Sequence, residues 1–155
     1  MYRVRAQKEL KQLAIEPPPP GIRLNVNEEN IQHWKGEIDG PEGTAYHGYI
    51  LRVNIKLGDN YPLASPTVNF EHLVYHPNIG TSGNICLDIL QSQWAPTLSV
   101  KTVMLSLSSL LNDPNVDSPL NGNAAQNWKH DKKKYFEEAK NLCERHCKTT
   151  QIQSQ

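Results

Sequence analysis

The chain has 155 residues, of which 37% are hydrophobic, and its 16 basic residues balance its 16 acidic residues. A chain of this length can bury roughly two-thirds of its unfolded surface in one domain, so it needs no disulfide or metal to fold. The balanced charge argues against nucleic acid as the main partner, and no run approaches the roughly 18 apolar residues that a membrane span requires.

The start of the chain predicts a helix over residues 2–15 and an extended connector after it. Four apolar residues at helical spacing form one face of this helix, with the basic residues on other faces: Val4, Leu10, Leu13 and Ala14. Pro17–Pro20 cannot continue the helix, because proline lacks a backbone N–H and clashes with the preceding turn. Consecutive prolines favour a polyproline connection into the next segment.

Residues 22–70 predict an antiparallel sheet. Four short runs of apolar residues, most of them alternating with polar ones, predict strands at residues 22–26, 34–38, 49–55 and 67–70. Turn sequences at residues 39–43 and 58–62 separate these runs. Because consecutive strands joined by short polar turns pair with their neighbours, this segment predicts a four-stranded antiparallel meander.

The pattern changes after residue 70. Residues 71–97 contain several prolines and glycines and no sustained period, which predicts a long irregular segment of the kind that carries function. Ser99 can cap a central helix that runs to Leu111, and Asp131 can cap a final helix, with a short helix near residues 122–128 between them. The residues expected to face inward are Val100, Val103, Met104, Leu107, Leu110 and Leu111 on the central helix and Tyr135, Phe136, Ala139, Leu142 and Cys143 on the final one. We therefore expect a single α+β domain over residues 1–148 and a polar, disordered tail over residues 149–155.

Three cysteines give no disulfide framework, so we expect reduced thiols and a location in the cytoplasm or the nucleus. Cys143 and Cys147 lie four residues apart on the final helix with His146 between them, a spacing that could place soft metal ligands on one face. A fourth ligand is missing from the local sequence, and helical cysteines are usually small buried hydrophobes. We therefore expect no bound metal.

Cys86 is the cysteine best placed for chemistry, since it lies in the irregular segment between apolar neighbours. Asn78, eight residues upstream, has an amide that can donate hydrogen bonds to a developing oxyanion. The lone thiol fits a buried cysteine as well as a nucleophile. A cysteine hydrolase would pair it with a base, and His76 lies ten residues upstream. Proline after His76 favours an extended backbone there, and the signatures of papain-like and caspase-like proteases are absent.

The sequence around Cys86 resembles the active-site signature of ubiquitin-conjugating enzymes. The matching stretches are Tyr75–Ile79, Gly83–Leu90 and Trp94–Pro96, supported by Trp34, Gly36, Gly40–Pro41, Tyr61–Pro62, Pro66 and Asp113–Asn115. Each stretch alone is weak, but together in this order they are highly specific, and they cover residues 5–146. The resemblance implies the fold of that family, an α+β domain with a four-stranded antiparallel meander, an N-terminal helix, a central helix and C-terminal helices.

The resemblance also implies a function. Such an enzyme accepts ubiquitin as a thioester from the ubiquitin-activating enzyme and transfers it to lysines of protein substrates, usually with a ubiquitin ligase, expected here to be of RING type. In that family the histidine of the His-Pro-Asn tripeptide holds the loop, so His76 is expected to support the site, Cys86 to be the nucleophile and Asn78 the oxyanion donor. No bound cofactor is implied, because ATP is consumed by the activating enzyme. Neither nucleic acid nor a membrane is implied as a partner.

Further roles follow at positions that match the family. Leu87 and Asp88 are expected to line the channel for the ubiquitin tail, with Asp117 and Ser118 beside the incoming lysine. Leu105 is expected to contact the donor ubiquitin, although a leucine there could equally lie in the core. The expected surface for the activating enzyme and ligases consists of Arg5, Lys8, Leu63, Ala95 and Pro96, of which the two basic residues could also form a merely solvated face.

Ser118 departs from the family pattern, since many members have Asp-Asp-Pro where this chain has Asp117-Ser118-Pro119. Within the family, residues 100–105, 117–121 and 124–125 look most like the class that serves the anaphase-promoting complex. Two other functions stay open: a conjugating enzyme for another modifier, such as SUMO or NEDD8, and a non-catalytic adaptor of the same fold. The SUMO enzyme has an insertion between its cysteine and tryptophan that this chain lacks, and such adaptors lack the cysteine.

Overall fold

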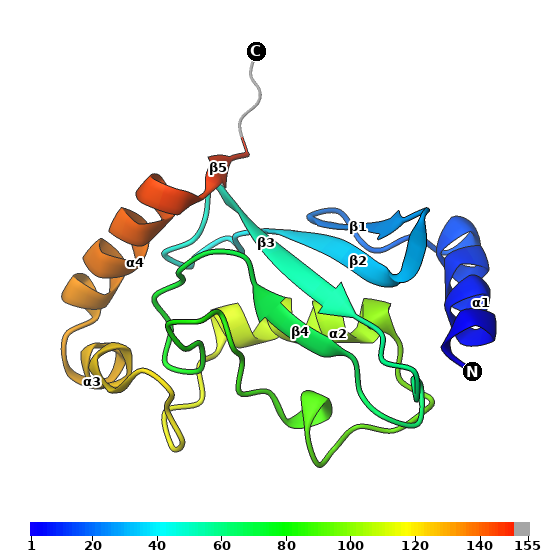
Figure 1. The fold of residues 1–155 in the computed structure, drawn as a ribbon. Coiled ribbons are helices and arrows are strands. Elements are labelled where there is room, and N and C mark those ends of the chain that lie inside the picture. Colours follow the sequence, from blue (N-terminus) through cyan, green and yellow to red (C-terminus); the bar gives the residue numbers. More distant parts are fainter. Residues whose placement is uncertain (151–155) are drawn as a thin grey trace.

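The computed structural model describes residues 1–150 and shows one antiparallel sheet flanked by helices (Figure 1). The elements in chain order are α1 (Tyr2–Ile15), β1 (Ile22–Asn27), β2 (Asn30–Asp39), β3 (Tyr49–Lys56), β4 (Thr67–Phe70), the 3-10 turn η1 (Asp88–Leu90), α2 (Val100–Asn112), α3 (Gly122–His130), α4 (Lys132–His146) and β5 (Lys148–Thr149). These elements confirm the predicted α+β class and its order of helices and strands. Among the described helices, none is both long and apolar enough to cross a membrane.

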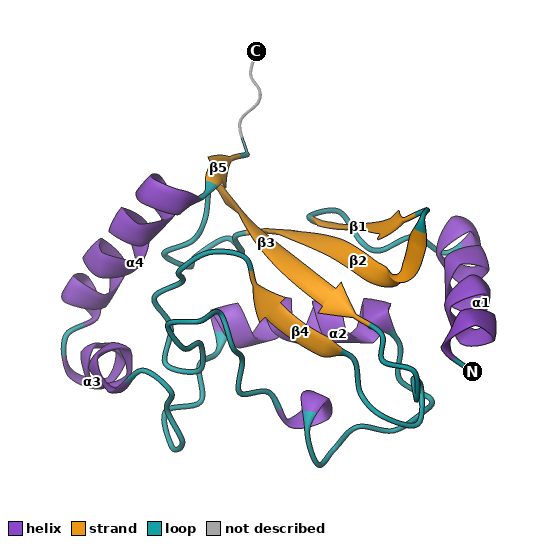
Figure 2. Cartoon of the chain, viewed as in Figure 1, coloured by secondary structure: helices purple, strands orange, loops and turns teal. Residues whose placement is uncertain are grey.

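The sheet has the order β1-β2-β3-β4, with every neighbouring pair antiparallel (Figure 2). Side chains of one face stand in register across the strands, as where Trp34 lies between Val26 and Ile55. The short strand β5 adds to β3, where Thr149 pairs with Tyr49. The expected domain boundary at residue 148 therefore falls inside a strand, and residues 151–155 of the expected tail lie outside the described part of the chain.

Helix α2 packs on one face of the sheet, while α1 lies at one end of the sheet and α3 and α4 at the other (Figure 1). The Ser99 hydroxyl caps α2 by accepting from Thr102 N at 3.2 Å, as predicted. All six apolar residues predicted to face inward on this helix are buried. Gly36 on β2 leaves room for the end of the Met104 side chain, since a Cβ there would lie 2.5 Å from Cε of Met104 in its present position.

Two helix faces differ from the predictions. On α1 the buried residues are Ala6 and Glu9, and Glu9 has polar partners in the interior; Leu10 and Leu13 pack partly against the core as predicted, whereas Val4 and Ala14 are exposed. On α4 the exposed fraction of Phe136 is 38%, because Tyr135 takes the inward position beside it. Asp131 caps α4 as predicted, accepting from Lys134 N at 3.1 Å.

Candidate active site

The segment before Cys86 is a tight turn docked on the end of β4. Gly83 N donates to Gly80 O at 3.0 Å to close the turn, and Phe70 N donates to Gly83 O at 2.9 Å to dock it on the strand. Gly83 has a φ of +82°, and a Cβ at this position would lie 2.2 Å from Phe70 O. Only glycine fits such a close approach in the left-handed region. The turn therefore fixes where the chain re-emerges as Cys86.

Cys86 is held from the other side by the His-Pro-Asn segment. Its backbone N–H donates to Asn78 O at 2.9 Å, and its thiol is half-buried. A half-buried thiol keeps one side open to a reaction partner while the backbone around it is fixed. Cys86 and Asn78 are therefore brought together, as the motif implied.

His76 is fully buried, and both ring nitrogens have partners inside the protein. Asn78 N donates to Nδ1 at 3.0 Å, so Nδ1 is an acceptor and the ring proton must be on Nε2, which donates to Leu110 O at 2.7 Å. Burial lowers the pKa of His76 to about 4, against the opposing effect of the Leu110 carbonyl. The ring is thus neutral at pH 7, ties the active segment to α2, and has no free nitrogen to act as a base for a thiol.

The Asn78 side chain is buried and bound at both ends to the backbone of Asn115. Its Oδ1 accepts from Asn115 N at 2.9 Å, and its Nδ2 donates to Asn115 O at 2.6 Å. Within residues 1–150, the second Nδ2 hydrogen has no hydrogen-bond partner. The amide therefore braces the neighbouring loop and keeps one donor for another acceptor.

The loop after α2 is held against the active segment by its other end as well. Leu120 N and Asn121 N both donate to Pro77 O, at 2.8 and 3.1 Å. Between these anchors, Asp117 and Ser118 are exposed. An acidic group and a hydroxyl thus border the same segment that holds the thiol.

Leu87 and Asp88 follow the thiol in different environments. Leu87 is buried in the core, whereas Asp88 is exposed and its Oδ1 accepts from Ile89 N at 2.7 Å at the start of η1. Asp88 O also accepts from Gln93 N at 3.0 Å, which curls the chain back after the turn. Leu87 thus fixes the segment by packing into the core, whereas Asp88 faces solvent.

A second group of expected residues gathers where α1 meets the loop before α2. Arg5 donates to Pro96 O and Leu98 O, both at 2.6 Å, and its Nε contacts Glu9 at 3.0 Å. Its guanidinium is therefore engaged in holding this loop. Pro96 is exposed at the edge of the same loop and Ala95 is half-buried.

Glu9 is a buried carboxylate that sequence reasoning missed. Oε1 accepts from Val100 N at 2.9 Å at the start of α2, and Oε2 accepts from the Tyr61 hydroxyl and from Arg5. A carboxylate at a helix N-terminus is stabilised by the unpaired N–H groups there. The one local signal was the spacing of Arg5 and Glu9, which places opposite charges on one face of a helix.

The remaining expected contact residues are exposed on separate elements. Lys8 lies on α1, and Leu63 is 65% exposed in the loop after β3. Leu105 is 39% exposed on the outward side of α2, so it is not part of the core. It borders a hollow of about 490 Å³ that also touches Pro41 and Ser109. In the described residues no three His, Cys, Asp or Glu side chains come together as a metal site.

The sequence was compared with models of known protein families. A family model described as ubiquitin-conjugating enzyme matches residues 5–143. This range includes Cys86, Asn78 and the loop that holds them, as well as most of α1.

Proposed function

Because the chain belongs to the ubiquitin-conjugating enzyme family, we propose that it accepts ubiquitin as a thioester on Cys86 and transfers it to lysines of protein substrates. The single observation that carries this proposal is the half-buried thiol of Cys86, held by Asn78 in a segment that α2 and the loop at Asn115 brace. The other two cysteines lie elsewhere, Cys143 on α4 and Cys147 directly after it.

The first half-reaction transfers the ubiquitin acyl group from a thiol of the activating enzyme to the thiol of Cys86. The Cys86 thiolate attacks the carbonyl of the C-terminal glycine of ubiquitin, a new C–S bond forms, and the sulfur of the activating enzyme leaves as a thiolate. Such an exchange needs proximity and a thiolate more than it needs a strong base. This requirement agrees with a site in which His76, the nearest histidine in sequence, has both ring nitrogens occupied.

The second half-reaction is aminolysis. A neutral lysine attacks the thioester carbonyl, the oxygen becomes an oxyanion, and collapse expels the Cys86 thiolate while the amine loses its proton to water. The spare Nδ2 hydrogen of Asn78 supports a role as donor to that oxyanion. At a usual pKa of about 10.4, only about one lysine in a thousand is neutral at pH 7, so the exposed Asp117 and Ser118 are proposed to orient the amine.

The proposed partners follow from the two surfaces. The activating enzyme and a RING-type ligase would share the surface of Lys8, Leu63 and Pro96, whose position Arg5 fixes from within. The donor ubiquitin would fold back on Leu105, and its tail would pass Asp88. We propose action in the cytoplasm or the nucleus, without a bound cofactor, and within the class that serves the anaphase-promoting complex.

The test is incubation with activating enzyme, ATP and each modifier in turn, read on a non-reducing gel. We expect a thiol-sensitive adduct with ubiquitin, an oxyester resistant to thiols with Cys86→Ser, and nothing with Cys86→Ala. An adduct with SUMO or NEDD8, and none with ubiquitin, would mean that the enzyme acts on that modifier instead of ubiquitin. A thiol-sensitive adduct that survives in Cys86→Ala would move the reaction to another cysteine, and no adduct with any modifier would favour an adaptor.

A further inference from the structure

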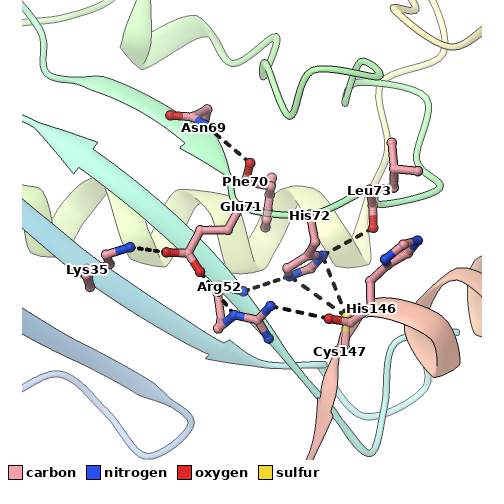
Figure 3. Close-up of polar contacts among 9 residues, drawn as sticks. All are labelled: Lys35, Arg52, Asn69, Phe70, Glu71, His72, Leu73, His146 and Cys147. Carbon is pink, nitrogen blue, oxygen red and sulfur yellow. Dashed lines mark hydrogen bonds and ion pairs between the residues drawn. The ribbon is translucent and has the colours of Figure 1, made fainter.

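A second cluster of reactive side chains lies where the C-terminal end of α4 meets β3 and the segment after β4 (Figure 3). Arg52 of β3 contacts Glu71 at 3.0 Å and donates to His146 O at 3.3 Å, while Glu71 also pairs with Lys35. The sulfur of Cys147 lies against the ring of His72. None of these side chains takes part in the proposed thioester chemistry.

The proton of His72 can be placed from its partners. Arg52 N donates to Nε2 at 3.0 Å, and a backbone N–H can only donate, so Nε2 is the acceptor and the proton of the neutral ring is on Nδ1. Nδ1 lies 3.2 Å from Leu73 O and 3.7 Å from Sγ of Cys147. The Nδ1–H group is therefore shared between a carbonyl and the sulfur, and it favours a negative charge on that sulfur.

Cys147 has a second thiol beside it. Cys147 N donates to Cys143 O at 2.8 Å, which keeps the two residues one helical turn apart, about 6 Å between Cα atoms and inside the range that a disulfide spans. Cys143 is buried and Cys147 half-buried. Cys147 is the residue that ends α4 and has extended backbone angles, φ −106° and ψ 151°, so no further helical turn restrains its side chain.

The surroundings favour the thiolate of Cys147 and the thiol of Cys143. Hydrogen bonds from Cys143 and His72 and the charge of Arg52 lower the pKa of Cys147, against the effect of burial, whereas the same pairing raises the pKa of Cys143. The groups that face Cys147 are Cys143 from α4, Arg52 and Tyr49 from β3, and His72. Cys147 is only half-buried, which leaves it accessible to a small solute, and a hollow of about 510 Å³ lies beside its neighbour His72.

We propose that Cys143 and Cys147 form a peroxide-reactive dithiol, a modification site separate from Cys86. The Cys147 thiolate attacks one oxygen of hydrogen peroxide, an S–O bond forms and the O–O bond breaks. The departing hydroxide takes up the proton that Cys147 released on ionising, which gives water and a sulfenic acid on Cys147. The Cys143 sulfur then attacks the Cys147 sulfur, the S–O bond breaks, and the departing hydroxide takes the Cys143 proton as water. Two thiols and one peroxide thus give one disulfide and two waters.

The advantage of Cys147 over an ordinary thiol should depend on pH. Below the usual thiol pKa of about 8.5, a thiol whose pKa is lowered keeps more of its thiolate than an ordinary thiol does, and the difference grows as the pH falls. We therefore expect the lead of Cys147 over an unperturbed thiol in its reaction with peroxide to be larger at pH 6 than at pH 8.

The test uses the full chain with Cys86→Ser, so that the proposed nucleophile cannot contribute. Hydrogen peroxide at pH 6 should remove about 2 Da, dithiothreitol should restore it, and peptide mapping should join Cys143 to Cys147. Cys143→Ala in this background should instead give a sulfenic acid of about 16 Da on Cys147, trapped by dimedone, and Cys147→Ala should give neither product. Circular dichroism would check that each variant is folded.

Two results would overturn the proposal. The first is a folded Cys86→Ser chain in which both thiols stay reduced at the peroxide concentration that oxidises Cys86 in the unmodified chain. The second is dimedone labelling of Cys143 rather than Cys147, which would reverse the assigned roles. A shift of the His72 ring signals on oxidation, absent in Cys147→Ala, would support the proposal further, because the disulfide draws the sulfur away from the ring.

Discussion

A single side chain, Asn78, links the active segment to the loop after α2. Its two hydrogen bonds both go to backbone atoms of Asn115, so replacing Asn115 by alanine leaves them in place, whereas replacing Asn78 removes both. This separates the side chain that braces the loop from the loop residue itself. It also provides a matched pair of variants for the proposed transfer reaction.

We expect Asn78→Ala to leave loading of Cys86 near normal and to slow lysine discharge by roughly 10²–10³-fold if the amide serves the oxyanion, or by less if it only braces the loop. The lost buried hydrogen bonds should also lower the free energy of unfolding by about 2 kcal/mol. Single-turnover discharge and urea unfolding measure the two effects. Asn115→Ala keeps both Asn78 bonds and loses only the exposed bond that Asn115 Oδ1 accepts from Asp117 N, so it should slow discharge and lower stability less than Asn78→Ala does. An equal loss of loading and discharge in Asn78→Ala would count against the oxyanion role.

His76 predicts a dependence of stability on pH. Its folded pKa of about 4 lies below the usual value of about 6.5, so the neutral folded ring contributes stability that is fully present above pH 6.5 and is lost as the pH falls through 4. Between pH 7 and pH 5 we expect a loss of about 2 kcal/mol in the free energy of unfolding. Urea unfolding measures it. The titration-free variant His76→Gln should lack this part of the slope, and equal slopes in both proteins would refute the assignment.

At the scale of elements, Glu9 connects α1 to α2. Replacing it by glutamine leaves the buried Val100 N–H and the Tyr61 hydroxyl competing for one weaker acceptor, so Glu9→Gln should lower the free energy of unfolding by about 2–3 kcal/mol. Glu16, which is 70% exposed at the end of the same helix, provides the control, and Glu16→Gln should change stability by less than about 0.5 kcal/mol. Thermal or urea unfolding of both variants decides it, and similar effects would show that Glu9 has no special role.

The elements also show what a sequence can predict. Helix α2 was predicted with its cap and its whole buried face, because Ser99 and the apolar spacing are local signals. The burial of Glu9 could not be predicted, since it depends on Tyr61 and Val100, which are distant in sequence. Strand β5 had no local signal either, because two polar residues become a strand only by pairing with β3.

Some contacts of the candidate site could be predicted from the sequence and others could not. The motif brought together Cys86, Asn78 and His76, and the structure places all three in one segment. The Asn78 side chain reaches backbone atoms of Asn115, 37 residues away, and the residue type at position 115 does not reveal this contact. The Arg5 guanidinium was expected on a binding surface, and its use inside the protein depends on two carbonyls that only the folded loop presents.

At the scale of the whole molecule, the surface proposed for the ligase and the loop proposed to receive the acceptor lysine lie on different elements. Leu63 belongs to the exposed surface beside α1 and Pro96, whereas Ser118 belongs to the loop that is bound to Pro77 and Asn78. Contacts with partner proteins and entry of the acceptor lysine should therefore be separable by mutation. Leu63→Ala is expected to weaken ligase-stimulated transfer while leaving discharge to free lysine unchanged. It is therefore the control for Ser118 variants, which are expected to change discharge to free lysine itself.

Ser118 is where this chain has a hydroxyl in place of the acid of many relatives. A hydroxyl can accept one hydrogen bond from an approaching ammonium but adds no charge, so it orients the amine less strongly than a carboxylate does. Ser118→Asp, or phosphorylation, should therefore speed discharge to free lysine and leave loading of Cys86 unchanged. A carboxylate also stabilises the protonated amine, which opposes the gain, and we expect orientation to outweigh it because the family tolerates an acid at this position. Single-turnover discharge of the preformed thioester from pH 6 to pH 9 measures the balance, and a rate in Ser118→Asp that is unchanged or slower at every pH would show that Ser118 does not gate lysine entry.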